Sequence, residues 1–205
     1  MDAVVYVRES ALAESRWAVS AYRTALYDDG AVVDNPEWST VPPLVWKTVA
    51  SDRGLLRIEV GPDEIPDAPN VWFVHVDEPK ASPRATNLVA FATDHFPAGT
   101  VVTKYQFASL SVSNDDQVGA IRWYPTIATV HQVYVAQGWR RRKAGSALIY
   151  AADAVHQSLG WPGRLHSDGR RTDLGEQFMA AQRYPARFAA RTETTPSMDG
   201  PEPLG

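Results

Sequence analysis

The chain contains no cysteine among its 205 residues. This absence excludes a disulfide scaffold, a thiolate nucleophile and a thiolate metal site. The five histidines show no paired ligand spacing, so the sequence predicts no metal centre. The sequence also lacks a serine nucleophile elbow and a Gly-rich P-loop, which removes two common enzyme classes.

Long apolar runs are also missing. No stretch approaches the roughly 20 residues that a membrane-spanning helix needs, and the N-terminus lacks the basic and apolar regions of a secretion signal. We therefore expect a cytoplasmic protein without a membrane partner. Hydrophobic residues make up 44% and charged residues 21%, as in ordinary globular proteins. The net charge of −4 offers no overall attraction for nucleic acid.

The N-terminal part, residues 1–99, has weak patterns. We predict a strand at Ala3–Val7 and then a helix from the N-cap Ser10 to about Tyr27. Residues 31–69 are rich in proline, and only Leu55–Val60 reads as a strand there. The apolar residues that fall near one face of the predicted helix are Leu12, Val19, Tyr22 and Leu26.

From residue 70 the pattern is rich in β-branched and aromatic residues, which favour strands. Strands are expected at Val71–Val76 and Leu88–Thr93, followed by a three-stranded meander. The meander comprises Val101–Ser111, Val118–Tyr124 and Thr129–Val135.

A helix is predicted next, from about Ala144 to Ser158, because apolar residues recur there at helical spacing. Its solvent side is expected to carry Tyr150, Asp153 and Gln157.

The final elements follow from that helix. A short strand at Arg164–Ser167 is expected to run parallel to Thr129–Val135, since a helix connects the two. Thr172 then caps a helix from Asp173 to about Arg183. Residues 189–205 hold few apolar side chains and read as a flexible tail.

The strongest functional signal is the turn between the last meander strand and the long helix. The run Arg140-Arg141-Arg142-Lys143 places four cations beside a helix N-terminus, where main-chain N–H groups also point outward. Such a point is suited to phosphate. A solvated basic loop and a nucleic-acid contact are the alternative interpretations, and the acidic net charge disfavours the second.

The order strand, Arg-rich turn, small-residue helix start, strand and helix resembles the GCN5-related N-acetyltransferase (GNAT) superfamily. Its cofactor motif Arg/Gln-x-x-Gly-x-Gly/Ala matches Arg140–Gly145 with Lys143 at the first glycine, and a second register, Arg142–Ala147, also fits. The resemblance covers roughly residues 100–184. It implies an α+β fold, with a mixed, mainly antiparallel sheet flanked by helices and a cofactor cleft between two splayed central strands.

The resemblance also implies an acyl-CoA-binding core at residues 100–188 that takes acetyl-CoA. The main chain of Val133 and Val135 would pair with the pantetheine arm, and a main-chain N–H of Tyr134 or Val135 would contact the thioester carbonyl. The residues implied in cofactor binding are Val133, Tyr134, Val135, Arg140, Arg141, Arg142, Lys143, Ala144, Gly145, Ser146 and Ala147.

Four residues are candidates for catalysis. His131 shares the sequence parity of Val133 and Val135 and is a candidate base, with a hydrogen-bonded strand histidine as the alternative. Tyr184 is a candidate acid near the end of the last helix, where packing is the alternative. Ser167 and Asp168 end the short strand beside the implied cleft, with a turn as the alternative.

The implied function is direct transfer of an acyl group to the amine of an acceptor, which is a small molecule, a peptide or a nucleobase. Two alternatives remain open: a phage-type enzyme of the same fold that modifies nucleobases, and a non-catalytic interaction module. The oligomeric state is left open.

Overall fold

We describe a computed structural model that covers residues 3–12, 16–51, 53–182 and 188–195. Within these ranges eleven strands form one mixed sheet, in the order β11-β10-β9-β7-β6-β8-β5-β4-β2-β1-β3. The α+β class is confirmed. Three neighbouring pairs are parallel (β1–β3, β6–β8 and β10–β11), and the other pairs are antiparallel.

The sheet strands are β1 (Ala3–Leu12), β2 (Arg16–Thr24), β3 (Val32–Asp34), β4 (Leu44–Ala50), β5 (Leu56–Val60), β6 (Trp72–Glu78), β7 (Ala85–Phe91), β8 (Thr100–Thr103), β9 (Gln117–Tyr124), β10 (Thr129–Val135) and β11 (His166–Ser167). A separate pair comprises β12 (Arg170–Arg171) and β13 (Glu193–Thr194). The α-helices are α1 (Lys104–Phe107), α2 (Ala144–Ser158) and α3 (Asp173–Ala180), and the 3-10 turns are Asn114–Asp116 and Gln137–Trp139. Among the described residues, no helix is long and apolar enough to cross a membrane.

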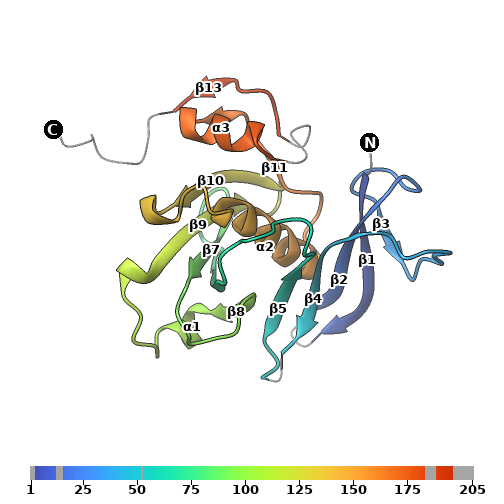
Figure 1. Ribbon diagram of the computed structural model, residues 1–205, viewed down its shortest axis with the longest axis horizontal. Coiled ribbons are helices and arrows are strands. Elements are labelled where there is room, and N and C mark those ends of the chain that lie inside the picture. The colour runs from blue at the N-terminus through green and yellow to red at the C-terminus, as the bar shows by residue number, and fades with distance from the viewer. Residues whose placement is uncertain (1–2, 13–15, 52, 183–187, 196–205) are drawn as a thin grey trace.

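Helix α2 is the centre of the molecule. It packs against β2, β4 and β5 from the first half of the chain and against β7, β9 and β10 from the second (Figure 1). All of its residues except Ile149 and Tyr150 are buried. Its many alanines let the helix axis approach the sheet closely, and residues 1–99 and 100–188 therefore share one core.

A buried carboxylate joins α2 to the N-terminal strands. Asp153 accepts hydrogen bonds from the Tyr6 hydroxyl at 3.0 Å and from the Trp46 indole N–H at 3.1 Å. Gln157 is also buried and donates to the Gly163 carbonyl at 2.9 Å. The predicted solvent side of this helix is therefore wrong for Asp153 and Gln157, because the sheet and the following loop cover that side too.

The predicted helix from Ser10 to Tyr27 is wrong. The segment forms the end of β1 and all of β2, in which Val19, Ala21 and Arg23 are buried at a spacing of two residues. Leu26, which the helical pattern placed on the apolar face, is 74% exposed. Burial in this segment alternates with the two-residue period of a strand, and the match of its apolar residues to helical spacing was coincidental.

The predicted meander is correct only for its last two strands. The first predicted strand, Val101–Ser111, stops at Thr103, which caps α1 through a reciprocal capping box with Gln106. Strand β8 then lies between β6 and β5 and does not contact β9 as a neighbour. Strands β9 and β10 form the expected antiparallel pair.

Trp161, just after α2, is surrounded by aromatic and charged side chains. Its ring centroid lies 5.7 Å from that of His156, 6.2 Å from that of His75 and 6.2 Å from that of Trp123, and the Arg84 guanidinium lies 5.7 Å from it. Burial lowers the pKa of His156 to about 4, and burial together with Arg16 lowers the pKa of His75 to about 4. Both imidazoles are therefore neutral at pH 7.

Stability should fall as the pH drops from 6.5 toward 4. The unfolded chain binds protons on these histidines in that window and the folded chain does not, so acid favours unfolding. For His156, a pKa of about 4 instead of 6.5 corresponds to about 3 kcal/mol. Urea unfolding between pH 6.5 and 5 should show this slope, and His156→Gln should reduce it. If the free energy of unfolding of the variant depends on pH as steeply as that of the wild type, His156 is not the group responsible.

Candidate functional site

Strand β10 contains a bulge at His131. Val130 pairs with Trp123 but Gln132 pairs with Arg122, which leaves His131 as the extra residue. Val130, Val133 and Val135 consequently all pack on the α2 side, although unbroken alternation would separate Val130 from the other two.

The bulge corrects the expectation that His131 shares a face with Val133 and Val135. Its ring is exposed and lies 5.0 Å from that of Tyr124. Tyr134 lies on the same side as Ala120, its partner in β9, and away from the core. His131 therefore lies on the side of the sheet away from α2.

Strands β10 and β11 separate soon after they begin to pair. Only Thr129 and Val130 pair with β11, opposite His166 and Ser167, whereas β10 continues to Val135. In the described part of the chain, residues 131–135 have a neighbouring strand on the β9 side only. A strand edge without a neighbouring strand is the geometry to which an extended ligand can add.

The basic turn is held by a few local contacts. The Arg140 Nε donates to the Val135 carbonyl at 3.1 Å, which ties the turn to the end of β10. The Arg142 guanidinium lies 4.6 Å from the Trp139 ring centroid, a cation–π distance. Arg141, with φ of 59°, and Lys143, with φ of 63°, both adopt the left-handed conformation, and these two side chains and Arg142 are exposed.

The first turn of α2 follows directly. Lys143 is the N-cap, and no side chain caps the helix. Its first N–H groups have no partner within the helix, as at every helix N-terminus. Ala144 and Ala147 are buried against the body of the protein, and the Ser146 hydroxyl donates to the Gln182 side-chain oxygen at 3.2 Å. This end of α2 therefore lies beside three exposed cations, while the residues of its first turn are buried.

Gly145 has a different role from the expected one. A Cβ atom at this position would lie 2.8 Å from Cε2 of Phe178 on α3. The missing side chain thus lets α3 pack onto α2, and the Phe178 ring covers the space in which a ligand was expected.

Gly145→Ala should therefore destabilise the protein by about 1–2 kcal/mol, because overpacking outweighs the gain in helix propensity. Phe178→Leu should remove the clash. In a double-mutant cycle by urea unfolding, Gly145→Ala should be less costly in the Phe178→Leu background. If the two substitutions change the free energy of unfolding additively, the contact with Phe178 does not account for the destabilisation by Gly145→Ala.

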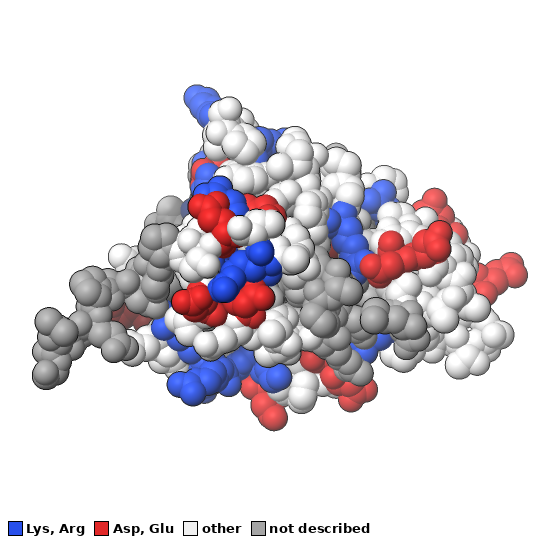
Figure 2. Space-filling view, turned by 90° about the horizontal axis from the view of Figure 1, so that it is seen from above, with Lys and Arg blue, Asp and Glu red and all other residues white. Residues whose placement is uncertain are grey.

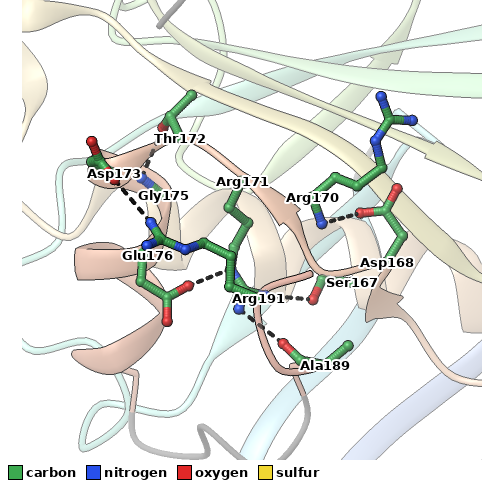
Figure 3. Close-up of polar contacts among 10 residues, drawn as sticks. All are labelled: Ser167, Asp168, Arg170, Arg171, Thr172, Asp173, Gly175, Glu176, Ala189 and Arg191. Carbon is green, nitrogen blue, oxygen red and sulfur yellow. Dashed lines mark hydrogen bonds and ion pairs between the residues drawn. The ribbon is translucent and has the colours of Figure 1, made fainter. Parts of the chain in front are cut away.

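The candidates Ser167 and Asp168 belong to a polar network that fixes α3 (Figure 3). The buried Arg171 donates to the Ser167 hydroxyl at 3.0 Å, to Glu176 at 2.8 Å and to the Ala189 carbonyl at 2.8 Å. The Asp168 carboxylate accepts from the Arg170 N–H at 2.9 Å. These contacts give Ser167 and Asp168 a structural role.

The other expectations for the C-terminal end have mixed outcomes. Thr172 caps α3 as predicted, accepting from the Gly175 N–H, but the helix ends at Ala180. Tyr184 lies outside the described residues. The predicted tail begins with residues that include β13, which pairs with β12, and residues 196–205 lie outside the described ranges.

Charges of both signs lie side by side on the face that carries α3 and β13 (Figure 2). Ion pairs account for several of them: Arg170 with Glu193, Arg171 with Glu176, and Arg191 with Asp173. Over α3 and β13, the described charges therefore alternate in sign, whereas a duplex-binding surface is basic.

A cavity of about 240 Å³ adjoins the first turns of α2. It is lined by residues 63–65 after β5, by the N-cap Lys143, by Ser146 and Tyr150 of α2, and by residues 181–182 after α3. Beneath it, the buried side chains of Arg23 and Glu64 form an ion pair, and the Tyr150 hydroxyl donates to Glu64 at 2.9 Å. Apart from the residues of the basic turn and Ser146, none of these was predicted from the sequence, since no spacing connects a proline-rich loop with two helices.

Comparison with protein-family models, with curated proteins and with solved structures finds no match to this chain.

Proposed function

We propose that this protein is an acyl-CoA-dependent N-acyltransferase with a GNAT-like core, and that acetyl-CoA is its acyl donor. The observation that carries the proposal is the position of the β10 edge beyond Val130, which has no neighbouring strand on the β11 side among the described residues. This edge leads directly to the basic turn and to the uncapped N-terminus of α2. An extended arm that ends in phosphates matches this order of main-chain edge, cations and helix dipole.

The residues around the turn fit such a donor. Arg141, Arg142 and Lys143 are exposed, and Arg142 is oriented by Trp139, so guanidinium and ammonium groups are available for phosphates. Phe178 covers Gly145, so binding would occur on the Lys143 side of the first turn. The main chain of Val133 to Val135 would hold the pantetheine arm.

The donor supplies an activated thioester. In the transfer, the acceptor nitrogen forms a bond to the acyl carbon and the carbon–sulfur bond breaks. The nitrogen loses a proton and the departing thiolate gains one. A main-chain N–H on the β10 edge would polarise the carbonyl. His131, exposed at the bulge, remains our candidate for taking the proton. Ser167 is a weaker candidate, since Arg171 holds its hydroxyl.

The direct test is a calorimetric titration of the purified protein with acetyl-CoA at physiological salt. We expect micromolar affinity and a stoichiometry of one. Binding should be followed by an assay of free thiol release with a panel of amines. Absence of binding at millimolar acetyl-CoA would overturn the proposal and favour the interaction module.

A further inference from the structure

The loop between β3 and β4 packs on the outer face of the sheet. In the sheet order, β1 and β2 lie between β3 and β4, so residues 35–43 cross from one side of this strand pair to the other. Alternation along β2 places Tyr22 on the face away from α2, because the preceding Ala21 belongs to the core beneath α2. The ring centroid of Trp38 lies 6.1 Å from that of Tyr22, so the loop lies against this outer face.

A second ring joins the loop to the chain that follows β2. The Tyr27 and Trp38 ring centroids are 5.7 Å apart, and the ring planes meet at 88°. At the end of the loop, the Pro43 carbonyl accepts a hydrogen bond from the Arg23 N–H at 2.9 Å. The two segments therefore lie side by side. We call them together the loop surface, which comprises residues 25–28 and 35–43.

The loop surface exposes apolar side chains. Leu26 is 74% exposed and Val41 is 67% exposed, and of the large apolar side chains described only Tyr105 is more exposed. The rings of Tyr27 and Trp38 are only partly buried as well. Single exposed apolar residues are ordinary on protein surfaces, whereas a group of them marks a contact site for another molecule.

The charge of this part of the chain has one sign. Residues 24–46 contain four acidic residues and no Lys, Arg or His. In Figure 2, the side chains at the right-hand end, which is the end that carries β1 and β3 in Figure 1, are mainly acidic or uncharged. Two of the four acids face a cation of the same chain: Asp29 pairs with Arg164, and Asp34 lies opposite Arg8 in the pairing of β3 with β1.

The other two acids flank the aromatic rings. Asp28 follows Tyr27, and Glu37 precedes Trp38. Both are exposed, and within the described ranges neither carboxylate has an ion pair or a hydrogen bond. A cation at this point would meet aromatic rings and carboxylates together, and proteins hold guanidinium and ammonium groups with both.

We propose that the loop surface is a docking site for an extended segment of a partner protein that carries Arg or Lys among apolar side chains. Its cation lies beside Tyr27 and Trp38 and the carboxylates that flank them, and its apolar side chains cover Leu26 and Val41. A cationic segment is complementary to these carboxylates, whereas nucleic acid and anionic membranes would be repelled by them. The strands β3 and β10 lie near opposite ends of the sheet, so the inference does not rest on the proposed function.

The test selects a displayed library of random peptides against the full chain, without acyl donor. The peptide that is enriched most is synthesised and titrated by calorimetry at physiological salt. We expect enriched peptides to contain Arg or Lys together with apolar residues, and the replacement of these cations by glutamine to weaken binding at least about tenfold. The inference fails if no peptide is enriched, or if the glutamine peptide binds equally well.

Charge-reversal variants locate the site. Asp28→Lys combined with Glu37→Lys should weaken the selected peptide at least about tenfold, a loss of about 1.4 kcal/mol. The matched control is Asp94→Lys combined with Asp115→Lys, which makes the same change in net charge at two exposed acids beyond β7 and before β9. The control should bind like the wild type. Equal affinities of the two double variants would place the peptide elsewhere.

A third double variant tests the apolar contact. Leu26→Ser combined with Val41→Ser removes two exposed apolar side chains, so the fold should stay intact, which thermal unfolding checks. The selected peptide should bind this variant at least about tenfold more weakly. Unchanged affinity would contradict docking on these residues. Peptide binding without any binding of acetyl-CoA would leave this inference standing and overturn only the acyltransferase proposal.

Discussion

Replacing Arg23 by methionine should destabilise the protein by about 3–5 kcal/mol. The side chains of Arg23 and Glu64 are only 7% and 2% exposed and form an ion pair. Removing the cation leaves a carboxylate buried with the Tyr150 hydroxyl as a neutral donor. Such an uncompensated charge is costly because nothing then offsets the solvation that it lost on folding.

The control is the double variant Arg23→Met with Glu64→Gln. It removes both charges, so most of the stability should return. Urea unfolding at pH 7 measures the three free energies of unfolding, with the wild type as reference. If the double variant is as unstable as Arg23→Met alone, packing of the arginine stem accounts for the effect, and the ion pair does not.

The second large effect is expected at the basic turn. Arg141→Ala combined with Arg142→Ala should weaken acetyl-CoA binding about 10- to 150-fold for each phosphate hydrogen bond that is removed, because a hydrogen bond to a charged group contributes about 1.5–3 kcal/mol. Both side chains are exposed, so the fold should stay intact. The affinity of the wild type should also fall as salt is added.

Calorimetry with acetyl-CoA measures this effect, and thermal unfolding checks the fold. The matched control is Arg53→Ala, another exposed arginine in a turn, which lies between β4 and β5. Its affinity should equal that of the wild type. If the double variant binds acetyl-CoA as tightly as the wild type, the phosphates do not bind at this turn.

The sequence predicted the C-terminal half of the fold better than the N-terminal half. The predicted bounds of β10 and α2 are confirmed. The strong β propensity of the first segment and the helical repeat of the second each allowed only one interpretation. The parallel pairing of β11 with β10 is also confirmed. Strand β2 was missed because nine residues with buried positions at every second place also fit a loose helical pattern.

The site was predictable only where it is local. The run Arg140–Lys143 could be singled out from the sequence alone, because four adjacent cations just before a helix mark a point that is suited to phosphate. His131 was misplaced since a bulge changes parity without any sequence signal. Arg23 and Glu64 belong to separate segments, and only the complete sheet brings their side chains together. Gly145 was singled out for cofactor binding, but its neighbour in the structure is Phe178, 33 residues further along the chain.

The position of α2 has a consequence for synthesis of the chain. Tyr6, Trp46 and Ile58 belong to strands that emerge from the ribosome long before residues 144–158 exist. Until α2 arrives, their apolar face has no cover, and the Tyr6 and Trp46 donors have no carboxylate to bind. We therefore expect the nascent N-terminal strands to expose an apolar face, which favours aggregation, until one helix covers a surface that was synthesised long before it.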